Sequence, residues 1–123
     1  MIDRAGLIPA HGKLTKASEF KLAFKSRDRS ADGLFLVFAR QNGLDQARLG
    51  CAFSKRRLAK AVARNRLKRL VRESFRAHHQ SLAGLDVVVT AQKDLSAVAN
   101  PELRTSLDRH WKKIAACAPS SSA

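Results

Sequence analysis

The chain has 123 residues, the size of one domain, and 45% of them are hydrophobic, so we expect it to fold around a single core. Lysine and arginine total 24 against 10 acidic residues, a net charge of +14 that indicates a polyanionic partner: nucleic acid, anionic membrane or acidic protein. No apolar run approaches the roughly 20 residues that span a bilayer, and the first residues lack the apolar stretch of a secretory signal. A cytoplasmic location is expected.

The first half of the chain predicts one helix and two strands. Residues 1–14 show no periodicity and are expected to form an irregular arm, followed by a short helix over residues 15–25. The polar segment 26–33 predicts a turn-rich loop. β-Branched and aromatic residues then predict a strand over residues 34–41, and a second strand over residues 47–54, paired antiparallel with the first.

The second half changes to a helical period. Between about Leu58 and Ala77, one face of an amphipathic helix carries Leu67, Leu70, Val71 and Ser74. The run Leu85 to Ala91 is almost continuously apolar, as expected for a strand buried on both faces.

The last element predicted is a C-terminal helix. Its start is expected at Asn100, as an N-cap followed by proline and an acidic residue. Its buried face would consist of Leu103, Leu107, Trp111 and Ile114, and residues 118–123 are expected to be a disordered tail. The element order predicts a single domain over residues 1–123, of the α+β class, with three helices packed on a small, mainly antiparallel sheet.

The helix over residues 58–77 and its approach are strongly basic. A solvated helix face normally mixes both signs of charge in i,i+4 pairs, whereas here only Glu73 opposes the cations. Arginine predominates, and its planar guanidinium binds phosphates and stacks on bases, which favours nucleic acid over a membrane. The ten cations are Lys55, Arg56, Arg57, Lys60, Arg64, Arg66, Lys68, Arg69, Arg72 and Arg76.

Phenylalanines form the second candidate feature. Phe20 and Phe24 are one helical turn apart, and strand alternation sends Phe35 and Phe38 to opposite faces of the sheet. A cleft between the first helix and the sheet, floored by Phe20, Phe24 and Phe38, would suit stacking of unpaired nucleotides. Spacing alone favours the alternative, in which these side chains belong to the core.

Catalytic and metal-binding patterns are weak. Cys51 and Cys117 lack metal-ligand spacing and are expected to be reduced and near the core. The pair His78-His79 has no third ligand at a suitable spacing, and no carboxylate cluster or glycine-rich phosphate loop is present.

The segment GCAFSKRRLAKAVARNRLKRLVRESFR, from Gly50 to Arg76, resembles the signature of the protein subunit of bacterial ribonuclease P. Its centre is the Arg64-Asn65-Arg66 triplet. The resemblance extends more loosely to Phe20 and Phe24, the strand with Phe38, the segment DVVVTAQK and the last helix, and so covers most of the chain.

The resemblance implies that the protein assists a catalytic RNA. Proteins of this family bind a catalytic RNA, and that RNA with bound magnesium removes the 5′ leader of precursor tRNA. The protein would bind no cofactor itself, and its partners would be the catalytic RNA and precursor tRNA, with no DNA and no membrane. The family fold also implies a left-handed βαβ crossover around the basic helix, against the usual right-handed rule.

The resemblance also implies two sets of site residues in this chain. Phe20, Phe24 and Phe38 would hold the leader, which reverses the preference for core drawn from spacing. The contacts with the RNA subunit would be made by Lys55, Arg56, Arg64, Asn65, Arg66, Lys68, Arg69 and Arg72. Of these, Arg66 and Arg69 are expected to contribute little packing, so that replacing either by alanine would leave the fold intact.

The sequence also departs from the family pattern. Many relatives have tyrosine where Phe38 stands, so a phenolic hydrogen bond to the leader is missing. Many have glycine shortly before the Ala61-Val62 pair, where this chain has Leu58-Ala59-Lys60, which leaves the start of the helix open. The competing interpretations are a basic ribosomal or assembly protein and a self-sufficient nuclease.

Overall fold

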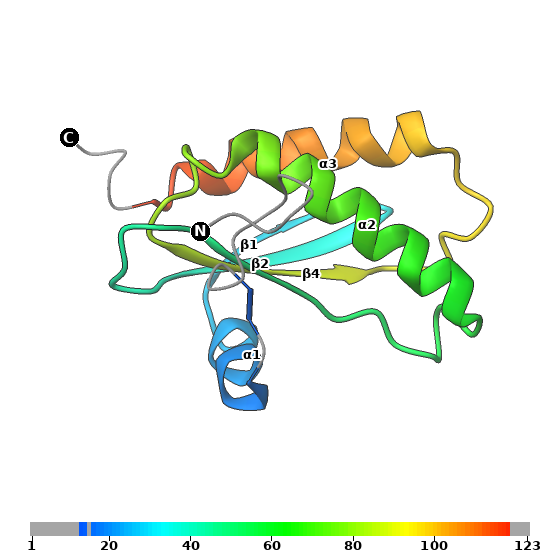
Figure 1. Cartoon of the computed structure of the whole chain (residues 1–123), viewed down its shortest axis with the longest axis horizontal. Helices are drawn as coiled ribbons and strands as arrows, with labels where there is room; N and C mark the ends of the chain where they lie inside the picture. Colours follow the sequence, from blue (N-terminus) through cyan, green and yellow to red (C-terminus); the bar gives the residue numbers. More distant parts are fainter. Residues whose placement is uncertain (1–12, 15, 119–123) are drawn as a thin grey trace, which may run out of the picture.

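The computed structural model describes residues 13, 14 and 16–118, and these form three helices and one four-stranded sheet (Figure 1). The α+β class with a small, mainly antiparallel sheet is therefore confirmed. Most of the predicted arm and tail lies outside the described residues. The elements are α1 Ala17–Phe24, β1 Asp28–Ala31, β2 Phe35–Gln41, β3 Arg48–Cys51, α2 Ala61–His78, β4 Leu85–Ala91 and α3 Asn100–Ala115.

The sheet has the strand order β1-β2-β4-β3. β2 pairs antiparallel with both β1 and β4, whereas β3 pairs parallel with β4. The predicted pairing of the second strand with the first is therefore wrong, because β4 inserts between β2 and β3. The central position of β4 explains its apolar sequence, since helices cover both of its faces.

The segment 26–33, predicted to be a loop, contains the edge strand β1. Its residues Asp28, Arg29 and Ala31 are exposed, and only Ser30 is buried. Four residues with one inward side chain produce too little alternation to be recognised as a strand. Between β3 and β4 the chain crosses through α2 in a parallel βαβ unit; the left-handed sense of this crossover stays a prediction.

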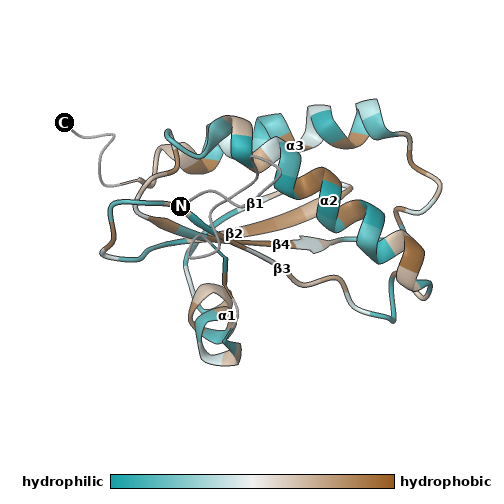
Figure 2. Ribbon diagram, in the orientation of Figure 1, coloured by the Kyte–Doolittle hydropathy of each residue, from teal (hydrophilic) through white to brown (hydrophobic). Residues whose placement is uncertain are grey.

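Helices α2 and α3 cover one face of the sheet (Figure 1) and form the main core with it. The predicted stripe of α2 is confirmed, since Leu67, Leu70 and Val71 are buried, and the stripe continues to Phe75. Ser74 lies on the same stripe, and there its Oγ accepts a hydrogen bond of 2.7 Å from the Trp111 indole N–H of α3. The apolar residues concentrate on the strands and on the inner faces of these helices (Figure 2).

Helix α1 packs on the opposite face of the sheet (Figure 1) over a much smaller core. That core consists of Leu14, Ala23, Phe38 and Val88. Leu14 belongs to the predicted arm, but its N–H donates to the Leu49 carbonyl at 3.0 Å, so the arm joins β3 at this point.

The last helix begins where the sequence predicts, but its cap differs. The N-cap is Ala99, and Asn100 is the first helical residue, with no side-chain cap. The predicted inner face of α3 is confirmed, since Leu103, Leu107, Trp111 and Ile114 are all buried.

A buried polar cluster joins α3 to the β1 edge. His110 Nδ1 lies 2.7 Å from Ser30 Oγ, and its Nε2 lies 3.3 Å from Asp32 Oδ1. Burial lowers the pKa of His110, against the opposing attraction of Asp32. Burial alone would raise the pKa of Asp32, but hydrogen bonds from the Phe35 N–H and the Ser106 hydroxyl hold it well below its usual range.

Candidate nucleic-acid interface

The cations of α2 and its approach divide into two groups according to their hydrogen bonds. Arg66 belongs to the first group, because its guanidinium is occupied within the protein. It donates to the Val98 carbonyl at 2.6 Å, to the Ser96 carbonyl at 3.2 Å, and to Asn100 Oδ1 at 2.8 and 3.1 Å. The side chain predicted to cap α3 therefore accepts from α2 instead. Arg66 fastens the β4–α3 loop to α2, and the expectation that it has little packing role is wrong.

Two further arginines are occupied in the same way. Arg64 donates to the carbonyls of Leu58 and Ala59, at 2.7 and 2.9 Å, and so holds the segment that leads into α2. Arg57 donates to the Gln92 carbonyl just after β4. Together with Arg66, these residues direct their charge at backbone carbonyls of the protein itself.

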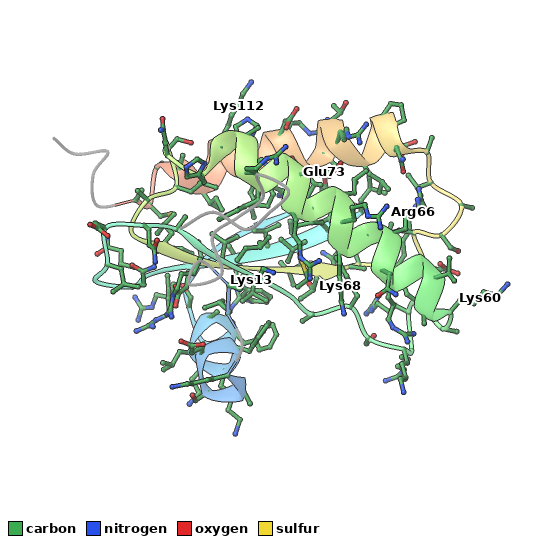
Figure 3. All side chains as sticks on the ribbon, in the orientation of Figure 1. Lys13, Lys60, Arg66, Lys68, Glu73 and Lys112 are labelled. Carbon is green, nitrogen blue, oxygen red and sulfur yellow. The ribbon has the colours of Figure 1, made fainter. Side chains whose placement is uncertain are left out.

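The second group consists of polar side chains that make no hydrogen bond or ion pair with any residue the structure describes. In Figure 3, Lys68 lies on the side of α2 toward Lys13, away from the side that carries Arg66 and Glu73. All members are exposed or partly exposed. We call this group the open basic face: Lys55, Arg56, Lys60, Asn65, Lys68, Arg69 and Arg72.

The open basic face meets the aromatic side of the molecule at the β3 edge. A hollow of about 200 Å³ there is lined by Lys68 and Arg72 of α2, Phe20 of α1, and Lys13, Leu14, Leu49, Gly50 and Cys51. Gly50 is required at this place, because a Cβ atom would lie 2.6 Å from Cζ of Phe20. The two predicted sites therefore adjoin at this hollow.

The three phenylalanines of the predicted cleft differ in exposure. Phe38 is only 7% exposed, with the Phe24 ring edge-on at 5.1 Å and the Arg29 guanidinium 4.9 Å from its ring centroid. Phe24 is 39% exposed, and Phe20 is half-buried between the helix and Gly50. Phe38 thus belongs to the small core, while Phe24 and Phe20 offer ring surface to the outside.

An ion network under α1 was missed by the sequence analysis. Arg48 Nε and Nη2 donate to the two carboxylate oxygens of Asp86 at 2.8 and 2.7 Å, and Nη1 donates to Glu19 Oε2 at 2.8 Å. The Asp86 side chain is 1% exposed and also accepts from Asn42 at 2.9 Å. These hydrogen bonds raise the pKa of Arg48, led by those to Asp86. An aspartate at the start of a buried apolar strand was the available signal, since it requires a partner.

The described residues contain no cluster of candidate metal ligands. Nowhere among them do three histidine, cysteine, aspartate or glutamate side chains come together as a metal site. Burial raises the pKa of the Cys51 thiol to about 12, against the opposing effect of Arg72 and Lys68, so it stays protonated. None of the described helices is long and apolar enough to cross a bilayer.

Comparison with known proteins gives consistent matches. Residues 8–115 match the family model described as Ribonuclease P. The chain is 45% identical over 112 residues to the ribonuclease P protein component of Pseudomonas putida strain GB-1, covering 90% of this chain and 84% of that protein. It is also 45% identical over 103 residues to the protein of the same name from Pseudomonas aeruginosa strain PAO1, covering 83% and 76%.

Solved structures agree with these matches. The Thermotoga maritima RNase P protein, in complex with 1-(4-fluorophenyl)-2-thiourea, superposes with a TM-score of 0.75 at 37% identity and covers 82% of this chain and 98% of that one. The Staphylococcus aureus RNase P protein also gives 0.75, at 29% identity and with coverages of 82% and 93%.

Proposed function

The chain belongs to the ribonuclease P protein family, and from this we propose that it binds the catalytic RNA subunit and assists removal of the 5′ leader from precursor tRNA. The product of this endonucleolytic cleavage is the mature tRNA 5′ end. The RNA subunit, with the magnesium it holds, carries the chemistry. The protein supplies binding and orientation.

The observation that carries this proposal is the open basic face. Its cations have no partner among the described residues, and folding gains nothing from a surface of one sign. Phosphates of an RNA would neutralise that surface and release counterions, which is the main source of affinity in such complexes. We therefore propose Lys55, Arg56, Lys68, Arg69 and Arg72 as the chief phosphate contacts, with Asn65 between them.

Arg64 and Arg66 take a second place in this proposal. Their guanidinium groups already satisfy backbone carbonyls, so an RNA contact would use only their remaining donors. Their main contribution would be indirect, by holding the segments on either side of α2 in the geometry that the RNA binds.

We place the leader along α1, beginning at the hollow beside Phe20. Lys68 and Arg72 line this hollow together with the Phe20 ring, which suits a nucleotide whose phosphate is paired and whose base stacks. Phe24 lies farther along the same helix, with its ring exposed. Phe38 would act as the floor that supports Phe24.

Reconstitution tests the proposed function. The purified protein is added to a bacterial ribonuclease P RNA at low magnesium, and cleavage of a precursor tRNA is followed. Restored cleavage at the mature 5′ end supports the proposal. Binding without restored cleavage would favour a ribosomal or assembly protein, and cleavage by the protein alone with added metal would favour a nuclease.

The Phe24→Ala variant tests the leader contact. Stacking on an aromatic ring contributes about 1–3 kcal/mol per base, so the preference of the reconstituted enzyme for precursor over mature tRNA should fall about fivefold to a hundredfold. Affinity for the RNA subunit should stay close to that of the wild type. Leu22→Ala is the matched control, because Leu22 is a large apolar side chain without a ring, lies on the same helix and is 48% exposed. An equal loss in both variants, or none in Phe24→Ala, would contradict the contact.

A further inference from the structure

Helix α1 has few apolar contacts to hold it in place. It has eight residues, and Ala23 is its one fully buried member. Isolated helices of this length are marginal in water, so tertiary contacts must fix it on the sheet. Its position matters to the proposed function, on which the present inference rests, because it carries Phe20 and Phe24.

Arg48 ties this helix to the centre of the sheet. One edge of its guanidinium binds the buried carboxylate of Asp86 on β4 through two hydrogen bonds. The remaining Nη1 reaches Glu19 on α1. The planar fork of arginine fits this arrangement, since it directs donors toward two carboxylates at fixed angles, whereas a lysine ammonium is a single point charge.

The neighbouring residues place this link next to the aromatic ring. Glu19 precedes Phe20 directly, and Arg48 lies two residues before Gly50, so Arg48 and Gly50 share one face of β3. Two successive residues of α1 thus meet two positions on the same face of one strand. Glu19 is bound by Arg48, and the Phe20 ring lies on Gly50.

We infer that Arg48, acting through Glu19, is a positioning residue that sets the placement of α1 and thereby the selectivity for precursor over mature tRNA. Arg48 and Glu19 are about one-fifth exposed, at 20% and 21%, so their ion pair is partly shielded from water. Without the pair, α1 would keep the contacts of Ala23 and Phe20 and lose the ion pair that ties its first turn to Arg48 on β3. The aromatic side chains would then occupy a wider range of positions, and leader binding would weaken.

The test compares two glutamate variants at equivalent places. Glu19 and Glu102 are each the third residue of a helix, and Glu102 is exposed without an ion-pair partner among the residues that the structure describes. Glu19→Gln removes the charge that faces Arg48, while glutamine can still accept the hydrogen bond from the Lys16 N–H. Asp86 keeps its two hydrogen bonds from Arg48, so the buried pair stays intact. Glu102→Gln makes the same change in net charge as the control.

Two measurements are made on each variant. Hydrogen exchange of the free protein should show faster exchange of the α1 amides in Glu19→Gln, with α2 and α3 unchanged. With the reconstituted enzyme, the preference for precursor over mature tRNA should fall about three- to tenfold, with RNA-subunit affinity unchanged. Arg48→Lys should give a similar loss, and adding Glu19→Gln to it should cause little further change.

The outcomes separate this inference from the proposed function. Unchanged α1 exchange in Glu19→Gln would overturn the link, and faster exchange with unchanged preference would overturn its effect on selectivity. Equal losses in Glu19→Gln and Glu102→Gln would show a general charge effect and also overturn the inference. A wild-type enzyme without any preference for the precursor would instead overturn the leader contact, and this inference with it, while the exchange data would still report on the link.

Discussion

Both flanks of α2 carry basic side chains, but those side chains make different contacts on the two flanks. On the flank toward α3, Arg66 binds the loop before that helix, and Glu73 pairs with Arg104 at 3.5 Å. On the flank toward β3, Lys68 and Arg72 border the hollow without an ion pair to any described residue (Figure 3). One flank is engaged in holding the fold together, and the other is the surface that we propose binds RNA.

This difference shows that a count of cations overstates a binding surface. Three of the ten cations between Lys55 and Arg76 are occupied by backbone carbonyls. Their hydrogen bonds join segments that are distant or adjacent along the chain, so these arginines contribute to the fold whether or not RNA is present. The partner hydrogen bonds of each cation, rather than its charge, identify the surface that is free to bind RNA.

The largest expected effect is the salt dependence of binding to the RNA subunit. If the six cations of the open basic face contact phosphates, affinity should fall about a thousandfold between 50 and 200 mM salt. If the three occupied arginines also contact phosphates, the decline should be steeper still. Affinities measured over a salt series give the number of contacts, and a complex insensitive to salt would contradict the interface altogether.

A pair of variants compares the two flanks directly. Arg66→Ala should lower the free energy of unfolding by about 1–3 kcal/mol, because it removes the hydrogen bonds to Ser96, Val98 and Asn100. Arg69→Ala should change stability by less than about 0.5 kcal/mol and reduce the salt slope by about 1. Denaturant melts and salt titrations of both proteins provide the measurements. The comparison fails if Arg66→Ala unfolds like the wild type and reduces the salt slope as much as Arg69→Ala.

The smallest expected effect involves neither flank. The lowered pKa of His110 means that the unfolded chain takes up a proton near pH 6.5, whereas the folded chain takes it up only at a lower pH. Stability should therefore decline as the pH falls from 7 to 5.5, by at most about 1.4 kcal/mol per pH unit. This pH range lies above the range in which the Asp32 carboxyl, with its lowered pKa, titrates. Melts at several pH values should show a flatter profile in His110→Gln, and an unchanged profile in that variant would contradict the prediction.

Most of the fold was predictable because its main elements are long and periodic. The stripe of α2, the apolar run of β4 and the inner face of α3 all appear where the sequence indicates. Two predictions were wrong. The segment that forms β1, which has one buried residue, was predicted to be a loop, and β2 was predicted to pair with β3 whereas it pairs with β4. Strand neighbours depend on contacts between distant segments, and periodicity within a segment carries no information about them.

The location of the candidate site stays a prediction from the sequence, and the structure adds detail that the sequence did not contain. A run of cations with one opposing acid marks α2 as a polyanion-binding helix from the sequence alone. Which arginines are occupied depends on where the carbonyls of Gln92, Ser96 and Val98 lie, and those loops are distant in sequence. The Arg48 network was missed for the same reason, since its members come from α1, β3 and β4.

The central place of β4 also governs how the chain folds during synthesis. In the described sheet, β2 and β3 meet only through β4, yet β4 follows α2 along the chain. Until β4 leaves the ribosome, the apolar stripe of α2 has no complete sheet to pack against. Closing such non-local pairs is slow, and we expect the folding rate to reflect this high contact order. A nascent chain that ends before Leu85 therefore presents the cations of α2 before any fold holds them in place.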